Sequence, residues 1–160
     1  MTIPNLVYGF TDASYVSTDD QKSISGYVFL SGGGAITWGS KKQTTIMLLS
    51  TEAEYVALSE ATHEVMWLCY LYEELGFVQK DPILLLGDND GSIAVVKNLE
   101  FHTRTKHVDI RWHWVWELYN DGLVNILDCR DPQQTPDILT KQIPRIKFVQ
   151  HVCELGMSSV

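Results

Sequence analysis

A stripe of apolar side chains at helical spacing divides this chain of 160 residues into two parts. The stripe begins at Tyr55 and recurs every three or four residues up to Leu75, which predicts an amphipathic helix of about six turns. Gly76 follows directly and is a natural helix end. Such a face must pack on an apolar surface, which the flanking segments are expected to supply. The stripe consists of Tyr55, Leu58, Ala61, Val65, Leu68, Tyr72 and Leu75.

Short apolar runs typical of strands lie on both sides of this helix. Three precede it, at residues 6–12, 26–30 and 35–39, and the glycines between the second and third runs predict a hairpin. Two more follow, at residues 83–87 and 123–129. Further helices are expected at residues 92–97, along a second apolar stripe from Val108 to Tyr119, and over residues 136–142, before Pro144 interrupts the helical pattern.

This order of elements predicts a single α/β domain over residues 1–160, with a five-stranded mixed sheet flanked by helices. The first three strands are expected to pair antiparallel. Crossovers through the helices are expected to make the first, fourth and fifth strands parallel, with right-handed connections. No apolar run approaches the roughly 18 residues of a membrane helix, and the N-terminus lacks a basic segment followed by an apolar one. An intracellular protein without a membrane partner is therefore expected.

Four carboxylates stand where predicted strands end or helices begin. Asp12 and Asp88 each close an apolar run, Glu54 lies in STEAEY at the start of the long helix, and Asp137 opens the helical segment PDILTK. Hard cations such as Mg²⁺ prefer carboxylate oxygens, and two such cations about 3.5–4 Å apart can activate a water and stabilise the leaving oxygen of a phosphodiester. The four positions therefore suit a metal-dependent site.

Each of these carboxylates also has a structural interpretation. Asp12 is a suitable turn residue, and Asp88 is a common way to end a strand. Glu54 fits the third position of a capping box, which is the favoured interpretation from the local sequence alone. Asp137 follows a proline at the expected first helical position, where it would interact with the helix dipole. The residues by themselves leave these alternatives open.

Five segments, in order, resemble the ribonuclease H domain of copia-type LTR retrotransposons. Each segment alone is short, but five in register are specific, and the resemblance extends from about Tyr8 to Lys141. Gly87 stands where that family often has cysteine, and Pro136 where it usually has alanine. The segments are SISGYVFLSGGGAITWGSKKQ, LSTEAEYVALSEA, GDNDGSIAV, FHTRTKHVDIR and PDILTK.

The resemblance implies a ribonuclease H-like fold and an endonuclease that hydrolyses the RNA strand of RNA–DNA hybrids during reverse transcription. It implies that Asp12, Glu54, Asp88 and Asp137 are catalytic and hold two Mg²⁺ ions, with Mn²⁺ as a possible substitute. Glu54 would also contact the 2′-hydroxyl that distinguishes RNA from DNA. Two alternatives are a related two-metal integrase or resolvase and a catalytically silent docking module.

Other residues are candidates for contact with the substrate. Asn89 follows the third carboxylate, where its amide suits a base edge or a sugar, whereas the neighbouring Asp90 is expected to be a solvated turn residue or an N-terminal helix residue. His107 and Arg111 share one helix face, for which exposure to solvent is the default interpretation and contact with substrate phosphate is the functional one. The full set of expected substrate-binding residues is Ser14, Lys41, Lys42, Asn89, His107 and Arg111.

The net charge of −8 is unusual for a protein that binds nucleic acid, because phosphate binding draws on a basic surface. Weak binding of hybrid is therefore expected, with a reverse transcriptase domain of the same polyprotein supplying much of the affinity. The resemblance implies a cytoplasmic location within virus-like particles. Three widely spaced cysteines argue against both a disulfide framework and a zinc site.

Overall fold

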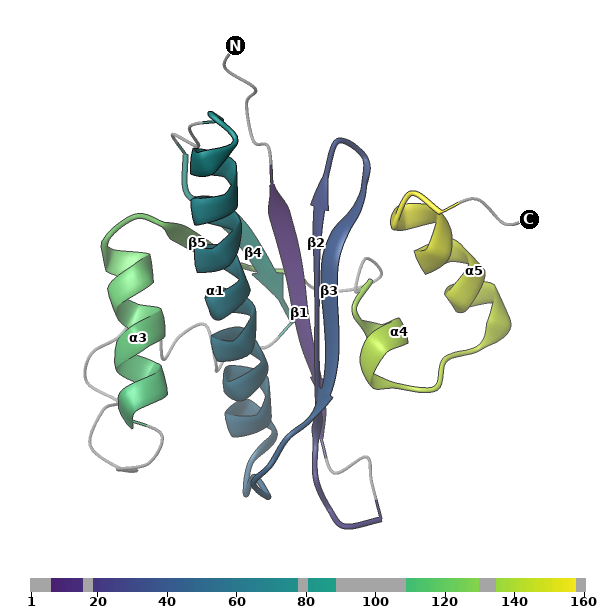
Figure 1. The fold of residues 1–160 in the computed structure, drawn as a ribbon. Coiled ribbons are helices and arrows are strands. Elements are labelled where there is room, and N and C mark those ends of the chain that lie inside the picture. The colour runs from purple at the N-terminus through teal and green to yellow at the C-terminus, as the bar shows by residue number, and fades with distance from the viewer. Residues whose placement is uncertain (1–6, 16–18, 78–80, 89–108, 130–134, 158–160) are drawn as a thin grey trace.

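The computed structural model describes residues 7–15, 19–77, 81–88, 109–129 and 135–157. Over these ranges the chain forms one sheet with helices on both faces (Figure 1). The predicted helix at residues 92–97 lies outside the described residues, as do Asn89, Asp90 and His107. The elements are β1 (Tyr8–Ser14), β2 (Ile24–Ser31), β3 (Gly34–Lys42), α1 (Ser50–Glu74), β4 (Ile83–Gly87), α3 (Asp109–Asn120), β5 (Val124–Asp128), α4 (Asp137–Thr140) and α5 (Arg145–Glu154).

The five strands are ordered β3-β2-β1-β4-β5. The first three pair antiparallel, whereas β1 pairs parallel with β4 and β4 parallel with β5. This arrangement confirms the predicted mixed sheet. Because β1 and β4 are neighbours and run the same way, Asp12 and Asp88 come to the same end of the sheet.

Two strands are longer than the apolar runs indicated. β1 continues past Asp12 to Ser14, and β3 continues to Lys42, because both ends pair with the start of β2. Asp12 therefore lies inside a strand. The apolar run alone suggests a turn residue at the end of the strand, which is wrong. The predicted hairpin between β2 and β3 is confirmed, and its turn residues Gly32 and Gly33 have φ angles of 62° and 88°. Both angles lie in the left-handed region that favours glycine.

Helix α1 starts earlier than the capping pattern indicated. Its N-cap is Leu49, so Glu52 occupies the third helical position. The Glu52 Oε2 atom accepts hydrogen bonds from the backbone amides of Leu48 at 3.0 Å and Leu49 at 3.4 Å. The prediction that Glu54 caps the helix was therefore wrong, and its side chain is not needed for capping. The other end agrees with expectation at Gly76, although Leu75 is exposed at the C-cap.

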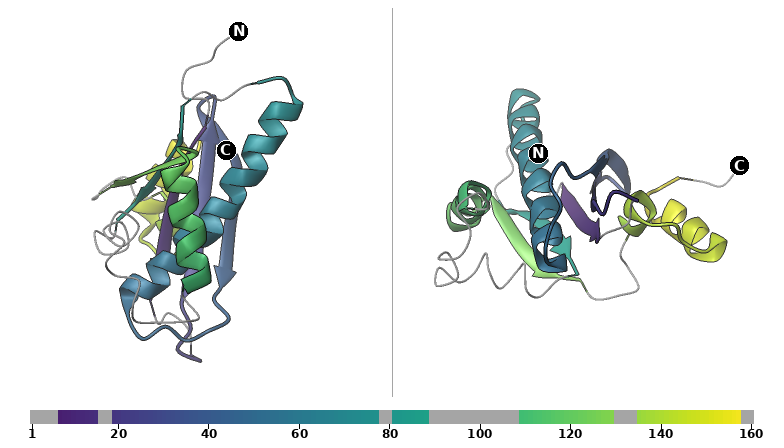
Figure 2. Two further views of the ribbon diagram at one scale, coloured as in Figure 1. Left: turned by 90° about the vertical axis from the view of Figure 1, so that its left-hand side faces the viewer. Right: turned by 90° about the horizontal axis from the view of Figure 1, so that it is seen from below.

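Helices α1 and α3 cover one face of the sheet, and α4 and α5 lie on the other (Figures 1 and 2). The stripe from Tyr55 through Leu68 is buried on α1, and α3 contributes Val115. A smaller cluster joins the opposite face of the sheet to α4 and Leu155, which follows α5. Among the described residues, no helix is long and apolar enough to cross a bilayer. Cys69, Cys129 and Cys153 form no disulfide.

The C-terminal helices differ from the predicted segment over residues 136–142. Pro136 is the N-cap of α4, so the first helical position belongs to Asp137. α4 ends at Thr140, and Pro144 is the N-cap of α5. Proline therefore separates two short helices, because its ring is compatible with a helix start but not with a helix interior.

Candidate active site

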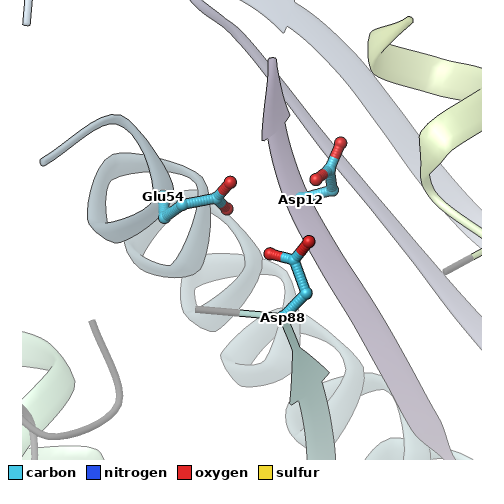
Figure 3. Close-up of side chains that lie close together, drawn as sticks. All are labelled: Asp12, Glu54 and Asp88. Carbon is cyan, nitrogen blue, oxygen red and sulfur yellow. The ribbon is translucent and has the colours of Figure 1, made fainter. Parts of the chain in front are cut away.

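Three of the four predicted acids meet at one end of the sheet (Figure 3). Asp12 comes from β1, Glu54 from the start of α1, and Asp88 directly follows β4. Each offers a carboxylate oxygen, and these three oxygens lie within 4.8 Å of one another. Asp12 is fully buried, whereas Asp88 is exposed, so the cluster lies between the protein interior and its surface.

Small residues allow α1 to bring Glu54 close to the strands. Ala53 and Ala57 pack directly against Ala13, the neighbour of Asp12 in β1. Glu54 accepts a hydrogen bond from the backbone amide of Ala13 and projects from the same side of α1 as the buried Leu58. The position of Glu54 thus follows from the packing of α1 on the sheet.

The carboxylates of the cluster hinder one another's ionisation. Burial, together with the charges of Asp12 and Asp88, raises the pKa of Glu54 to about 9. Burial and the charge of Asp12 also raise the pKa of Asp88. Such shifts indicate negative charge that a bound cation would compensate. A set of carboxylate oxygens alone is the donor set that Mg²⁺ prefers, so these residues fit a divalent cation.

Asp137 reaches the cluster through a lysine. Lys141 Nζ lies 2.9 Å from Asp137 Oδ1 and 3.1 Å from Asp12 Oδ1. The hydroxyl of the buried Thr140 donates a hydrogen bond to the other oxygen of Asp12. Both oxygens of Asp12 therefore contact residues at the end of α4. The motif PDILTK predicts Asp137 as a site residue. The contacts of Thr140 and Lys141 with Asp12 follow only from the fold.

The placement of α4 depends on a row of residues across three strands. Asp12 pairs with Gly26, which pairs with Ser40. Ser40 Oγ donates a hydrogen bond to the Leu139 carbonyl at 2.6 Å, which fixes α4 over this row. A Cβ atom on Gly26 would lie 2.5 Å from Thr140 Cγ2, so α4 contacts the sheet where β2 has no side chain.

Gly26→Ala is expected to lower the melting temperature by about 5 °C, because overpacking costs about 1–3 kcal/mol and moves α4 away from Asp12. Thermal unfolding followed by circular dichroism measures the effect. Gly34→Ala is the matched control and should change little, because the nearest atom to its new Cβ is 3.9 Å away. Adding Thr140→Ser to Gly26→Ala removes the clashing methyl group and should restore most of the loss. Failure of this rescue would contradict the steric explanation.

The predicted substrate-binding residues that the structure describes surround the same end of the sheet. Ser14 ends β1, and Lys41 and Lys42 end β3. Both lysines contact acids: Lys41 lies 3.6 Å from Glu60 and Lys42 lies 2.8 Å from Asp20. Arg111 is exposed on α3, and its carbonyl accepts a hydrogen bond from Tyr55, the neighbour of Glu54. Asn89 and His107 lie outside the described residues.

Comparisons with curated proteins show relatives among transposon polyproteins, although no family model matches the chain. The retrovirus-related Pol polyprotein from transposon TNT 1-94 of Nicotiana tabacum is 40% identical over 157 residues, covering 96% of this chain and 12% of the polyprotein. That from transposon RE2 of Arabidopsis thaliana is 32% identical over 155 residues, covering 96% of the chain and 11% of the polyprotein. The chain thus spans about a tenth of these relatives' length.

Solved structures of ribonucleases H share the fold. LC11-RNase H1, isolated from compost by a metagenomic approach, has a TM-score of 0.60 at 14% identity, covering 85% of this chain and 93% of that one. Its complex with an RNA/DNA hybrid has a TM-score of 0.56 at 13% identity, covering 84% and 93%. The sheet order, together with these similar structures, thus defines a ribonuclease H-fold protein, whose clustered acids lie at one end of the sheet. Within that class, the chain belongs to the family of copia-type retrotransposon Pol polyproteins, of which it corresponds to one segment.

Proposed function

We propose that this chain is a divalent-metal-dependent endonuclease that hydrolyses the RNA strand of RNA–DNA hybrids during reverse transcription of a retrotransposon. The observation that carries the proposal is the meeting of Asp12, Glu54 and Asp88 within 4.8 Å at one end of a ribonuclease H-fold sheet. Homology to Pol polyproteins supports the retrotransposon role. The RNA/DNA hybrid in a structural neighbour supports the substrate class.

Asp12, Glu54 and Asp88 would hold the cations, with Asp137 joining them from α4. When bound, two Mg²⁺ ions, or Mn²⁺ in their place, supply an activated water and stabilise the leaving 3′-oxygen, which gives 3′-hydroxyl and 5′-phosphate ends. The chain itself positions its carboxylates: β1 and β4 fix Asp12 and Asp88, while α1 sets Glu54 beside them. Glu54 would also accept a hydrogen bond from the RNA 2′-hydroxyl, which distinguishes RNA from DNA.

The test is a cleavage assay on four labelled substrates with Mg²⁺. We expect cleavage of the RNA strand in a hybrid, and none of single-stranded RNA, duplex RNA or duplex DNA, because the site requires a 2′-hydroxyl beside a DNA strand. Chelation of the metal should abolish cleavage. Equal cleavage of duplex RNA and hybrid would contradict the proposed specificity. Full inactivity on hybrid with Mg²⁺ and with Mn²⁺ would favour a docking module.

We further propose that Ser14, Lys41, Lys42, Asn89, His107 and Arg111 contact the hybrid, and that the reverse transcriptase domain of the same polyprotein supplies much of the affinity. The net charge of −8 supports this division. So do the contacts that Lys41 and Lys42 make with acids of this chain, because those acids offset their attraction for phosphate.

Binding of hybrid to the isolated chain should be weak and should fall steeply with salt, because only a few phosphate contacts form. Fluorescence anisotropy in Ca²⁺ at several salt concentrations measures it. Lys41→Gln should reduce affinity and the salt slope, whereas Lys147→Gln on α5 should change neither. Tight binding by the isolated chain at physiological salt would contradict this view of the charge distribution.

A further inference from the structure

Lys141 contacts two acids that are far apart in the sequence. Its Nζ atom donates to Asp12 Oδ1 at 3.1 Å and to Asp137 Oδ1 at 2.9 Å. The Lys141 side chain is 37% exposed, whereas that of Asp12 is fully buried. The ammonium group therefore lies at the boundary between the buried acid and solvent, in contact with an oxygen of the carboxylate cluster.

Thr140 fixes the place of this lysine. Thr140 is buried, and its hydroxyl donates to the other oxygen of Asp12, so the backbone before Lys141 is held against β1. Leu139 is tied to β3 by Ser40. These contacts direct the Lys141 side chain toward Asp12, with Asp137 one helical turn earlier.

The charge of Lys141 is well matched to its surroundings. Burial by itself would lower the pKa of the lysine, but the carboxylates of Asp12 and Asp137 outweigh it and raise that pKa above its ordinary value. A lysine amine is an ammonium ion at neutral pH, and this one lies between oxygens of two carboxylates. It offsets one negative charge of a group of acids that otherwise raise one another's pKa.

We propose that Lys141 is a built-in counter-ion, which holds Asp12 and Asp137 together in the metal-free chain and leaves Asp12 when a divalent cation binds there. The proposal rests on the proposed function in one respect, namely that the same carboxylates take a cation. An ammonium and a divalent cation on one carboxylate oxygen repel each other strongly at such distances. Binding of the cation must therefore displace the lysine. By stabilising the empty site, Lys141 weakens the affinity of the site for the cation.

The first test replaces the lysine by a side chain of similar length without charge. Without metal, Lys141→Met should lower the melting temperature by about 5 °C, because Asp12 then remains buried without its cationic partner. Titration calorimetry with Mg²⁺ at constant ionic strength should show a dissociation constant smaller by on the order of tenfold, because the competing charge is gone. Lys147→Met removes the same charge from the exposed face of α5 and should show neither effect.

A second measurement uses the wild-type chain and does not depend on the variant folding. Reductive methylation, read by mass spectrometry, reports how accessible each lysine amine is. Saturating Mg²⁺ should raise the methylation rate of Lys141 several-fold relative to that of Lys147. Unchanged Mg²⁺ affinity in Lys141→Met, or an unchanged methylation rate, would overturn the proposal. Neither measurement uses nucleic acid. If both effects on Lys141 are observed but the chain does not cleave hybrid, only the proposed function is contradicted.

Discussion

Replacing Asp12 by asparagine is expected to lower the rate of hybrid cleavage by more than about 100-fold. Even residues that only support metal ligands typically cost about 10–100-fold when changed, and Asp12 is the buried member of the carboxylate cluster. The rate of RNA-strand cleavage at saturating Mg²⁺ measures the effect. Asp121→Asn is the matched control, because Asp121 lies in the turn before β5, at the strand end opposite Asp128. This variant should cleave hybrid at the wild-type rate.

The same Asp12→Asn variant should also lose a few degrees of melting temperature without metal. Thr140 and Lys141 both donate to the carboxylate, and an asparagine amide would turn its own donor toward one of them. Relief of repulsion offsets little of this loss, because the raised pKa of Glu54 already keeps that neighbour neutral at pH 7. An active Asp12→Asn enzyme would contradict the assignment of Asp12 as a metal ligand.

Glu54→Gln is expected to reduce cleavage by a similar factor, more than about 100-fold, and to raise the metal-free melting temperature at pH 7. The pKa of about 9 means that folded, metal-free Glu54 is protonated at pH 7, so glutamine is nearly isosteric with it and avoids the proton uptake that folding of the wild-type chain requires. Glu52→Gln is the matched control, two residues earlier on the same helix. Its amide oxygen can still accept from Leu48 and Leu49, so activity should stay near wild type. An inactive Glu52→Gln enzyme would mean that the wrong glutamate has been assigned.

The raised pKa of Glu54 also predicts a pH dependence. Between the ordinary value of 4.5 and about 9, folded Glu54 keeps a proton that unfolded Glu54 has released. Raising the pH through this range therefore favours the unfolded state, and metal-free stability should fall. The test measures the melting temperatures of wild type and Glu54→Gln in chelator from pH 5 to 9. The two values should be similar near pH 5, and the variant should melt at a higher temperature than wild type near pH 9. Parallel curves would contradict the raised pKa.

Local sequence patterns predicted most elements because each pattern depends on near neighbours. The spacing of apolar residues from Tyr55 to Leu68 marks the buried face of α1, and the run at residues 83–87 coincides with β4. The paired glycines between β2 and β3 mark their turn. The exact helix start was not predictable, because the local pattern favours Glu54 at the third helical position, whereas α1 begins two residues earlier, with Leu49 as its N-cap and Glu52 at that position.

The sequence by itself determined the α/β class, the mixed sheet, and the candidate acids Asp12, Glu54 and Asp88, because periodicity and a dense resemblance mark them. Only the tertiary structure decided how α4 joins them. The contacts of Thr140 and Lys141 with Asp12 span more than a hundred residues, and they require α4 to pack on β2 where Gly26 has no side chain. No local pattern encodes such a contact, because its geometry depends on strand order and on the close approach of two backbones.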